Sequence, residues 1–429
     1  MHKKSKCLVI YMIDEILSGK VKKASFKGWV YRKREQKDAI FLIIRDSTGI
    51  IQCIIKKGDK SWKQAQKATI ESSVEITGTA KKDKRAPGGY EIKVDALKII
   101  GLAETYPISR DLSTEFLRDV RHLWLRSRKI TALIKISSKV SGLVHEFFRK
   151  QGYTEIHPPM FVSGACEGGS TLFEVDYFGK KAYLTQSWQL YAEAIAHAIE
   201  KIYTIAPSFR AEASHTSRHV TEFWHIEMEQ AHATMQDIMK IEEDMVLYVL
   251  KGVAKDCKKE LEELKVKIDI PKKPFPKITF DEAVKRLKAK GFKIGPEDDL
   301  GADEEKALAK DFKGPVFVYD YPRKVKAFYC KAYKDKPDYV MSTDLIVPRV
   351  GEISTGGSRV DDKKELIERM KEFGLDRKDY EWYIDLRKYG SVPHAGFGMG
   401  IERLIAWMLK LESIYDVLPF PRTPKRLYP

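Results

Sequence analysis

The chain has 429 residues, of which 43% are hydrophobic and 32% are charged, which indicates a soluble protein with a buried core and two or three domains. Its net charge of +16 and its pI of about 9.3 favour a polyanionic partner such as nucleic acid, although a solvated lysine-rich surface gives the same balance. No apolar stretch is long enough to span a membrane, and the run from Leu8 to Ile13 is too short for an export signal.

The cysteine pattern excludes two further classes of protein. The five cysteines are scattered without a C-x-x-C pair, so neither a zinc module nor a disulfide scaffold is indicated, and a cytoplasmic location is expected: Cys7, Cys53, Cys166, Cys257 and Cys330. We treat residues 1–22 as an N-terminal extension and lead-in, within which Met12 is an alternative start.

Residues 23–102 are rich in short alternating strands. Turn signals separate five of them, at residues 26–35, 39–46, 50–57, 72–82 and 90–100. Five strands in about eighty residues are typical of an OB-fold, a barrel that binds single-stranded nucleic acid, although other small barrels share this count. A charged linker follows over residues 103–128.

The next segment predicts a helix followed by an extended stretch. From Lys129 to Lys150 the apolar residues follow helical spacing, and Gly152 then breaks the pattern. After a loop of small residues around Glu167, a strand at 183–187 leads into a helix predicted from Gln189 to Ile199.

Residues 205–229 predict two strands joined by a polar loop. Alternation places Ser208, Arg210 and Glu212 on one face of the first strand. In the second strand one face carries these four residues: Phe223, His225, Glu227 and Glu229. Buried charges need partners, so this pattern indicates either a ligand with charged and aromatic parts or a salt-bridged surface hairpin.

The lysine-rich region at about 245–340 reads as an insertion to which we assign no chemistry. After it, Asp344 and Glu352 lie on neighbouring extended segments, and paired carboxylates are natural Mg²⁺ ligands. The three alternating glycines Gly396, Gly398 and Gly400 then leave one strand face bare, so that a flat group can lie against the backbone.

The sequence FRAE, the loop with Arg218-His219 and the sequence TEFWHIEME resemble motif 2 of class II aminoacyl-tRNA synthetases. Within that family the chain is most similar to asparaginyl enzymes of archaeal type. The segment around Pro159 resembles motif 1, which implies a homodimer, and Glu402-Arg403 after the glycines resembles motif 3. The resemblance implies an α+β protein in which an N-terminal OB-fold that binds the anticodon precedes a catalytic domain over residues 129–429, with an antiparallel sheet flanked by helices.

The resemblance also implies roles for individual residues, with ATP and Mg²⁺ as cofactors. The expected catalytic residues are Arg210, Glu212 and Arg403. ATP is expected to contact these three together with Arg218, His219, Phe223, Glu352 and Gly400. The amino acid is expected to contact Glu167, Gln189, Arg210, Glu227, Thr355 and Arg359. Asp344 and Glu352 are expected to bind the metal, and Phe41, Gln52 and Glu91 the anticodon.

Two positions favour asparagine, and hence tRNA(Asn), over aspartate. Ala192 stands where aspartyl enzymes carry a lysine that neutralises the substrate carboxylate, and Glu227 stands where they carry an aspartate. The alternatives are a non-discriminating aspartyl enzyme, an asparagine synthetase on the same catalytic domain, and a non-catalytic RNA-binding protein. A metal site at His215 and His219 lacks a third ligand.

Overall fold

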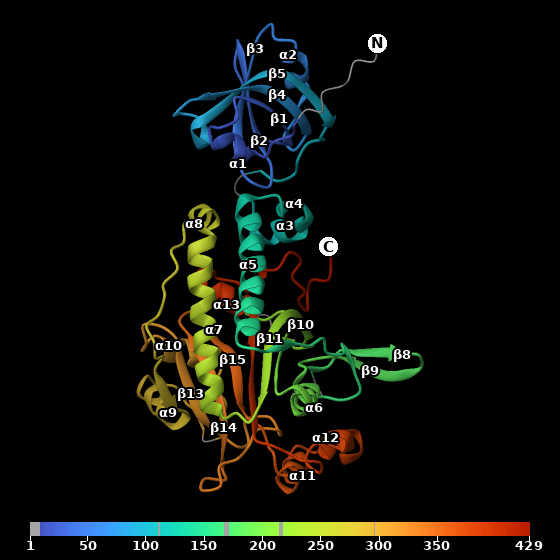
Figure 1. Cartoon of the computed structure of the whole chain (residues 1–429), viewed down its shortest axis with the longest axis vertical. Helices are drawn as coiled ribbons and strands as arrows, with labels where there is room; N and C mark the ends of the chain where they lie inside the picture. Colours follow the sequence, from blue (N-terminus) through green and yellow to red (C-terminus); the bar gives the residue numbers. More distant parts are fainter. Residues whose placement is uncertain (1–8, 110–111, 167–170, 214–217, 296) are drawn as a thin grey trace. The chain divides into compact units, whose positions relative to one another are not determined.

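The computed structural model describes residues 9–109, 112–166, 171–213, 218–295 and 297–429 (Figure 1). The chain divides into two compact units, Met1–Thr114 and Glu115–Pro429, and each is described by itself. The division falls inside the predicted linker. No helix among the described residues is long and apolar enough to cross a membrane.

The described part of the first unit contains a closed barrel with the strand order β1-β2-β3-β5-β4. Its strands are β1 (Lys23–Glu35), β2 (Ala39–Arg45), β3 (Ile50–Lys56), β4 (Ser73–Lys82) and β5 (Tyr90–Gly101). Its helices are α1 (Ile13–Leu17), α2 (Trp62–Lys67) and the 3-10 turn η1 (Pro87–Gly89). Strict alternation explains the barrel, because every second residue of β2 and β3 is buried in its core. The predicted five-stranded OB-fold is confirmed.

The second unit is built on an eight-stranded sheet, as far as the described residues show, with the order β12-β13-β14-β15-β16-β11-β10-β6. These strands are β6 (Thr154–Glu155), β10 (Lys201–Phe209), β11 (Glu222–Ala231), β12 (Lys277–Thr279), β13 (Val316–Pro322), β14 (Tyr339–Val347), β15 (Gly351–Ser358) and β16 (His394–Gly400). The central pairs are antiparallel, as the resemblance implied. A small sheet, β7-β9-β8, lies beside it: β7 (Phe161–Val162), β8 (Glu174–Tyr177) and β9 (Lys180–Leu184).

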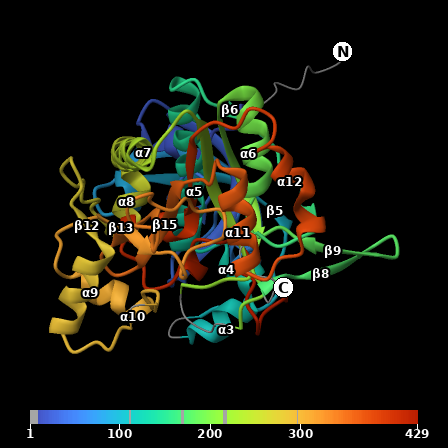
Figure 2. The same cartoon turned by 90° about the horizontal axis from the view of Figure 1, so that it is seen from below.

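Helices surround the sheet, and α6, α7, α9, α10 and α13 pack directly against its strands (Figures 1 and 2). In chain order, the helices before residue 265 are α3 (Thr114–Asp119), α4 (Arg121–Trp124), α5 (Arg128–Lys150), α6 (Gln189–Ile199), α7 (Met235–Asp256) and α8 (Lys258–Leu264). The later helices and 3-10 turns are α9 (Phe280–Ala289), α10 (Ala302–Ala309), α11 (Lys363–Glu372), η3 (Arg377–Tyr380), α12 (Glu381–Asp385), α13 (Ile401–Met408) and η4 (Ile414–Asp416). The predicted helices over 129–150 and 189–199 are confirmed as α5 and α6.

The main core lies between the sheet and the helices α5, α7 and α13. The apolar stripe predicted for α5 is buried there, together with residues of β11, β15 and β16. The region at about 245–340, predicted as an insertion on the catalytic domain, is integrated into the second unit. Its first residues belong to α7, which packs on β15 and β16, and its strands β12 and β13 extend the main sheet.

Candidate functional site

One cavity of about 610 Å³ opens above the middle of the sheet of the second unit. The hairpin of β10 and β11 supplies one wall, and Ser208 pairs with Phe223, so these two residues share a face as predicted. Arg210 and Glu212, which were predicted on the first strand, follow β10, because that strand ends at Phe209. Most of the predicted ligand-binding side chains line this cavity: Gln189, Arg210, Glu212, Arg218, His219, Phe223, Glu227, Glu352, Thr355, Arg359, Gly400 and Arg403. The structure therefore brings together residues that lie up to 214 positions apart in the sequence, from Gln189 to Arg403 (403 − 189).

Glycines keep the floor of the cavity low where β16 runs between β11 and β15. A Cβ atom on Gly398 would lie 2.8 Å from Nε2 of His225, and one on Gly396 would collide with the carboxylate of Glu229. Only glycine fits at these two positions, as predicted, whereas a Cβ atom on Gly400 would lie no closer than 3.8 Å to its nearest neighbour, Arg403.

At one end of the cavity, cations alternate with carboxylates. Arg403 Nη1 donates to Glu352 Oε1 at 3.1 Å and to the Glu352 carbonyl oxygen at 3.0 Å. Arg218 Nη1 donates to Glu305 Oε2 at 2.5 Å, and the backbone N–H of Glu352 donates to the same oxygen at 2.9 Å. Burial and the charge of Glu352 raise the pKa of Glu305 to about 7. This end suits a polyanion, because phosphate oxygens can replace the carboxylates around the guanidinium groups.

Between the two ends, an aromatic ring and two neutral histidines form the wall. The guanidinium carbon of Arg210 lies 5.6 Å from the ring centre of Phe223, within cation–π range. Burial is the main cause that lowers the pKa of His225 to about 3 and that of His219 to about 4, and the charges of nearby arginines contribute to both shifts. Both imidazoles are therefore neutral at physiological pH.

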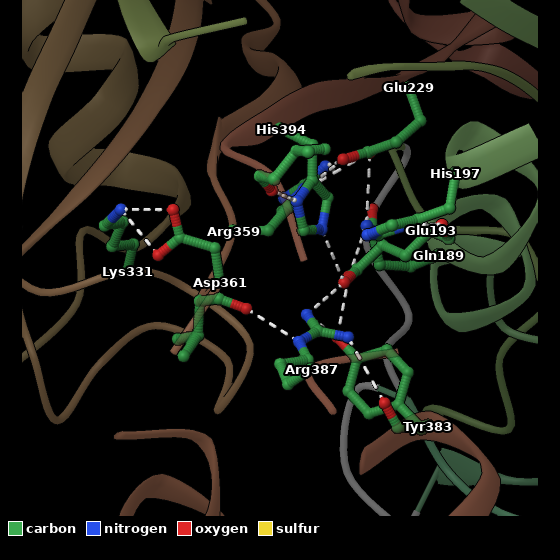
Figure 3. Close-up of polar contacts among 12 residues, drawn as sticks. Gln189, Glu193, His197, Glu229, Lys331, Arg359, Asp361, Tyr383, Arg387 and His394 are labelled. Atoms are coloured by element: carbon green, nitrogen blue, oxygen red, sulfur yellow. Dashed lines mark hydrogen bonds and ion pairs between the residues drawn. The ribbon is translucent and has the colours of Figure 1, made fainter. Parts of the chain in front are cut away.

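At the other end, buried ion pairs hold the polar side chains (Figure 3). Arg359 donates through Nε at 3.1 Å and Nη2 at 3.0 Å to the carboxylate of Glu229. Gln189 Nε2 donates to the same carboxylate at 3.2 Å. Glu227 accepts from the Ser187 hydroxyl and from the Trp188 N–H at 3.4 Å. The positive charge of Arg359 is thus already balanced, which suits an uncharged polar ligand at this end.

Two residues used in the sequence argument lie away from the cavity lining. Ala192 is fully buried in a small apolar cluster with Trp188, Ala196 and Ile202, between α6 and β10. Asp344 lies beneath the cavity, where its Oδ2 accepts from Lys326 Nζ at 2.7 Å. Ala192 thus supplies no charge to the site, but it does not face a ligand directly.

The carboxylates of Asp344 and Glu352 fit a divalent cation. Oδ1 of Asp344 is buried and makes no hydrogen bond to the described residues. Burial raises the pKa of Asp344 to about 6, and the negative charge of Glu352 adds to this effect while Lys326 opposes it. Two carboxylates that repel each other in this way are suitable ligands for Mg²⁺. The described residues contain no cluster of three or more acidic, histidine or cysteine side chains of the kind that holds a metal without further ligands.

Sequence reasoning missed three charged residues of the cavity lining. Asp299, Glu305 and Lys326 all come from the segment to which no chemistry was assigned. Glu305 contacts Arg218 across 87 residues of sequence, and no local pattern reveals such a pairing. Glu167 and His215 lie outside the described residues.

In the first unit, the three predicted anticodon-binding residues share the outer face of the barrel. Phe41 is half-buried, and the Arg34 guanidinium carbon lies 4.9 Å from its ring centre. Gln52 is paired with Glu91 across β3 and β5, and its Nε2 donates to Glu91 Oε2 at 3.2 Å. Their neighbours Leu42 and Cys53 point into the core, so Phe41 is not a core residue of the barrel.

Comparison with protein families gives two matches. A family of class II tRNA synthetases (D, K and N) matches residues 113–424, and a family of OB-fold nucleic acid binding domains matches residues 24–100.

Individual relatives match over nearly the whole chain. An asparagine–tRNA ligase of Thermococcus gammatolerans is 46% identical over 97% of this chain and 100% of the relative. One from Pyrococcus abyssi is 47% identical over 95% of this chain and 96% of the relative. The crystal structure of asparaginyl-tRNA synthetase from Pyrococcus horikoshii, complexed with asparaginyl-adenylate, has a TM-score of 0.94 at 45% identity and covers 98% of this chain and 99% of that one.

Proposed function

We infer that this chain, which belongs to the class II tRNA synthetases of the D, K and N group, is an asparagine–tRNA ligase. It activates L-asparagine with ATP and transfers the activated amino acid to tRNA(Asn). The observation that carries this assignment is the cavity itself, which joins an end with several arginines to an end where the one lining arginine, Arg359, is held in a buried ion pair with Glu229.

The reaction has two steps. A carboxylate oxygen of asparagine attacks the α-phosphorus of ATP, pyrophosphate leaves, and asparaginyl-adenylate forms. A hydroxyl of the terminal adenosine of the tRNA then attacks the acyl carbon, and AMP leaves. Positioning and charge neutralisation are sufficient for both steps, because the protein forms no covalent bond to the substrate.

The cationic end serves the nucleotide. Arg210, from the end of the β10 wall, neutralises the α-phosphate, where negative charge develops during attack. Arg218, His219 and Arg403 bind the β- and γ-phosphates, and Phe223 stacks on the adenine ring. Glu212 and Gly400 complete this part of the site. The carboxylates of Glu352 and Asp344 would hold Mg²⁺, which supplies positive charge to the phosphate oxygens when it is bound.

The balanced end serves the amino acid. Arg359 donates to the side-chain carbonyl of asparagine, and Glu227 accepts from the side-chain NH₂ group. Gln189, Thr355 and Glu167 complete the amino-acid site. An aspartate carboxylate would meet Glu227 without a cation to spare, which favours the carboxamide substrate.

The remaining assignments concern tRNA binding, cellular location and oligomeric state. Phe41, Gln52 and Glu91 bind anticodon bases of tRNA(Asn) through stacking and hydrogen bonds. The four cysteines that the structure describes form no disulfide with one another and are buried, which fits a reducing cytoplasm. The enzyme acts as a homodimer, with the segment around Pro159 at the subunit interface.

Amino-acid-dependent ATP–pyrophosphate exchange tests this function. We expect asparagine to support exchange and aspartate to support it at least about 100-fold more weakly, since a buried unpaired charge costs several kcal/mol. Chelation of Mg²⁺ by EDTA should abolish the exchange. Equal exchange with aspartate would identify a non-discriminating aspartyl enzyme, ammonia-dependent formation of asparagine would identify an asparagine synthetase, and no exchange with any amino acid would favour a non-catalytic RNA-binding protein.

A further inference from the structure

A buried carboxylate, Glu193, lies one helical turn after Gln189 on α6 and does not itself line the cavity. Its Oε1 accepts from Gln189 Nε2 at 2.9 Å and from the Tyr383 hydroxyl at 2.7 Å. Its Oε2 is bound by Arg387 Nη2 and lies 2.9 Å from Nε2 of His394 (Figure 3). Both oxygens of Glu193 are therefore fixed by side chains from three separate segments of the chain.

The ion pair with Arg387 keeps Glu193 charged and in place. Neither side chain is exposed, so each needs the other's charge. Arg387 is itself anchored, because its Nε donates to the Val360 carbonyl at 2.8 Å and its guanidinium lies 4.2 Å from the ring centre of Tyr383. Burial raises the pKa of Glu193, but Arg387 and His394 outweigh this effect and hold it below its ordinary value. Glu193 is therefore an acceptor only.

The orientation of the Gln189 carboxamide follows from its two partners. Its Nε2 donates to Glu193 Oε1 and also, at 3.2 Å, to Glu229 Oε2. Because both partners are carboxylates, which accept but cannot donate, only the NH₂ group can lie between them. Both amide hydrogens are thereby used, and the carbonyl Oε1 is the polar atom that Gln189 has left for a ligand in the cavity.

We propose that Glu193 is a positioning residue for amino-acid selection, which fixes Gln189 so that it presents an acceptor, and not a donor, to a nitrogen of asparagine. With the carboxamide turned over, its NH₂ group would face the substrate nitrogen and the hydrogen bond would be lost. The inference rests on the proposed function, since it concerns how asparagine is bound, but Glu193 itself touches no substrate.

Two double variants separate this role from simple charge balance. Replacing Arg387 by Met in both removes the buried cation, so that residue 193 no longer has a charge to neutralise. Glu193→Gln/Arg387→Met keeps an oxygen that can accept from Gln189 Nε2. Glu193→Leu/Arg387→Met has no acceptor there. Both are neutral at residues 193 and 387. They differ in the side chain offered to Gln189, and equally in that offered to Tyr383 and His394, which do not line the cavity.

The readout is the KM for asparagine and the KM for ATP in ATP–pyrophosphate exchange. We expect the KM for asparagine to rise about 10- to 100-fold in the Leu/Met variant, as for the loss of one hydrogen bond to a charged group, and by less than about threefold in the Gln/Met variant. The KM for ATP should remain unchanged in both. Equal KM values for asparagine in the two variants would overturn the proposal and leave Glu193 a structural role.

A matched control is Glu243→Gln, which alters another buried carboxylate, one that accepts from the Phe275 N–H at 3.0 Å and does not line the cavity. It should lower the thermal unfolding temperature without changing either KM, which shows that destabilisation alone does not mimic the effect. The wild-type protein reports separately on the proposed function. If it shows no exchange with asparagine, the function itself fails. If it does and the two double variants agree, only the role of Glu193 fails.

Discussion

The two ends of the cavity bind their cations in different ways. At the phosphate end, the side chains of Arg403 and Glu352 are 22% and 30% exposed, and a single nitrogen of Arg403 makes the contacts. At the amino-acid end, the side chains of Arg359 and Glu229 are 4% and 0% exposed, and three hydrogen bonds join them. A ligand can therefore replace the carboxylate partner of Arg403, whereas the ion pair between Arg359 and Glu229 is fixed.

This difference matches what each end recognises under the proposed function. A triphosphate carries enough charge to displace a carboxylate from a partly solvated arginine, so the phosphate end can exchange partners when the nucleotide enters. A small neutral side chain provides too little binding energy to break an ion pair. The side chains of the amino-acid end therefore have to be in place before the ligand binds. Under the proposed function, specificity comes from fixed donors and acceptors, and catalysis comes from arginines that exchange a carboxylate for a phosphate.

The strongest test of this contrast is Arg359→Ala. It leaves Glu229 buried without its cation, which should lower the free energy of unfolding by about 3–5 kcal/mol and reduce asparagine-dependent exchange at least about 1000-fold. Denaturant unfolding and pyrophosphate exchange measure the two effects. Arg359→Ala/Glu229→Gln should regain most of the stability without the activity. A single variant as stable as the wild type would contradict the locked arrangement.

Smaller effects on stability and activity are expected from Arg403→Ala at the cationic end of the cavity. The pair with Glu352 is partly exposed, so the free energy of unfolding should change by less than about 1 kcal/mol. The rate constant kcat should nevertheless fall about 100-fold, because a cation that neutralises the leaving pyrophosphate is lost. Arg403→Lys should recover part of kcat. A loss of stability as large as that of Arg359→Ala would erase the difference between the two ends.

The smallest effect concerns His225, which lies between the two ends. Its pKa is lowered to about 3, mainly by burial and also by Arg210 and Arg403. Between this value and its ordinary pKa of 6.5, the unfolded state binds a proton that the folded state does not. Its contribution to stability is therefore complete above pH 6.5 and declines as the pH falls, by at most about 1.4 kcal/mol per pH unit.

His225→Gln should remove this part of the pH dependence. The difference in unfolding free energy between pH 7.5 and pH 5.0, measured by urea denaturation, should be smaller in the variant than in the wild type. Identical pH dependence in the two proteins would mean that the imidazole becomes protonated in the folded state, and that the wall between the two ends is not a fixed neutral surface.

Much of the fold could be predicted because the relevant signals are local. Alternation over seven to thirteen residues was enough for the barrel strands, and helical spacing was enough for α5. The boundaries of α6, Gln189–Ile199, agree with the prediction at both ends. The glycines of β16 were interpretable because their spacing alone determines which face is bare.

The remaining features of the site could not be predicted, because they arise from contacts between residues that are distant in the sequence. Glu305 reaches the cavity because α10 packs beside β15, and its charged residues read locally as a solvated helix. The side chain of Ala192 points into the cluster between α6 and β10, although it is three residues from Gln189. The network around Glu193 joins residues up to 201 positions apart, and each of them alone gives no signal in the sequence.

The glycines of β16, which have no side chains to fill the bottom of the cavity, also limit how this enzyme can be redesigned. A side chain at Gly398 would strike His225, and one at Gly396 would strike Glu229, so neither position is open to engineering. Variants that accept a different amino acid must therefore be sought on the rims, at positions such as Thr355 of β15 or Glu227 of β11. Directed evolution of substrate scope should leave these two glycine codons untouched.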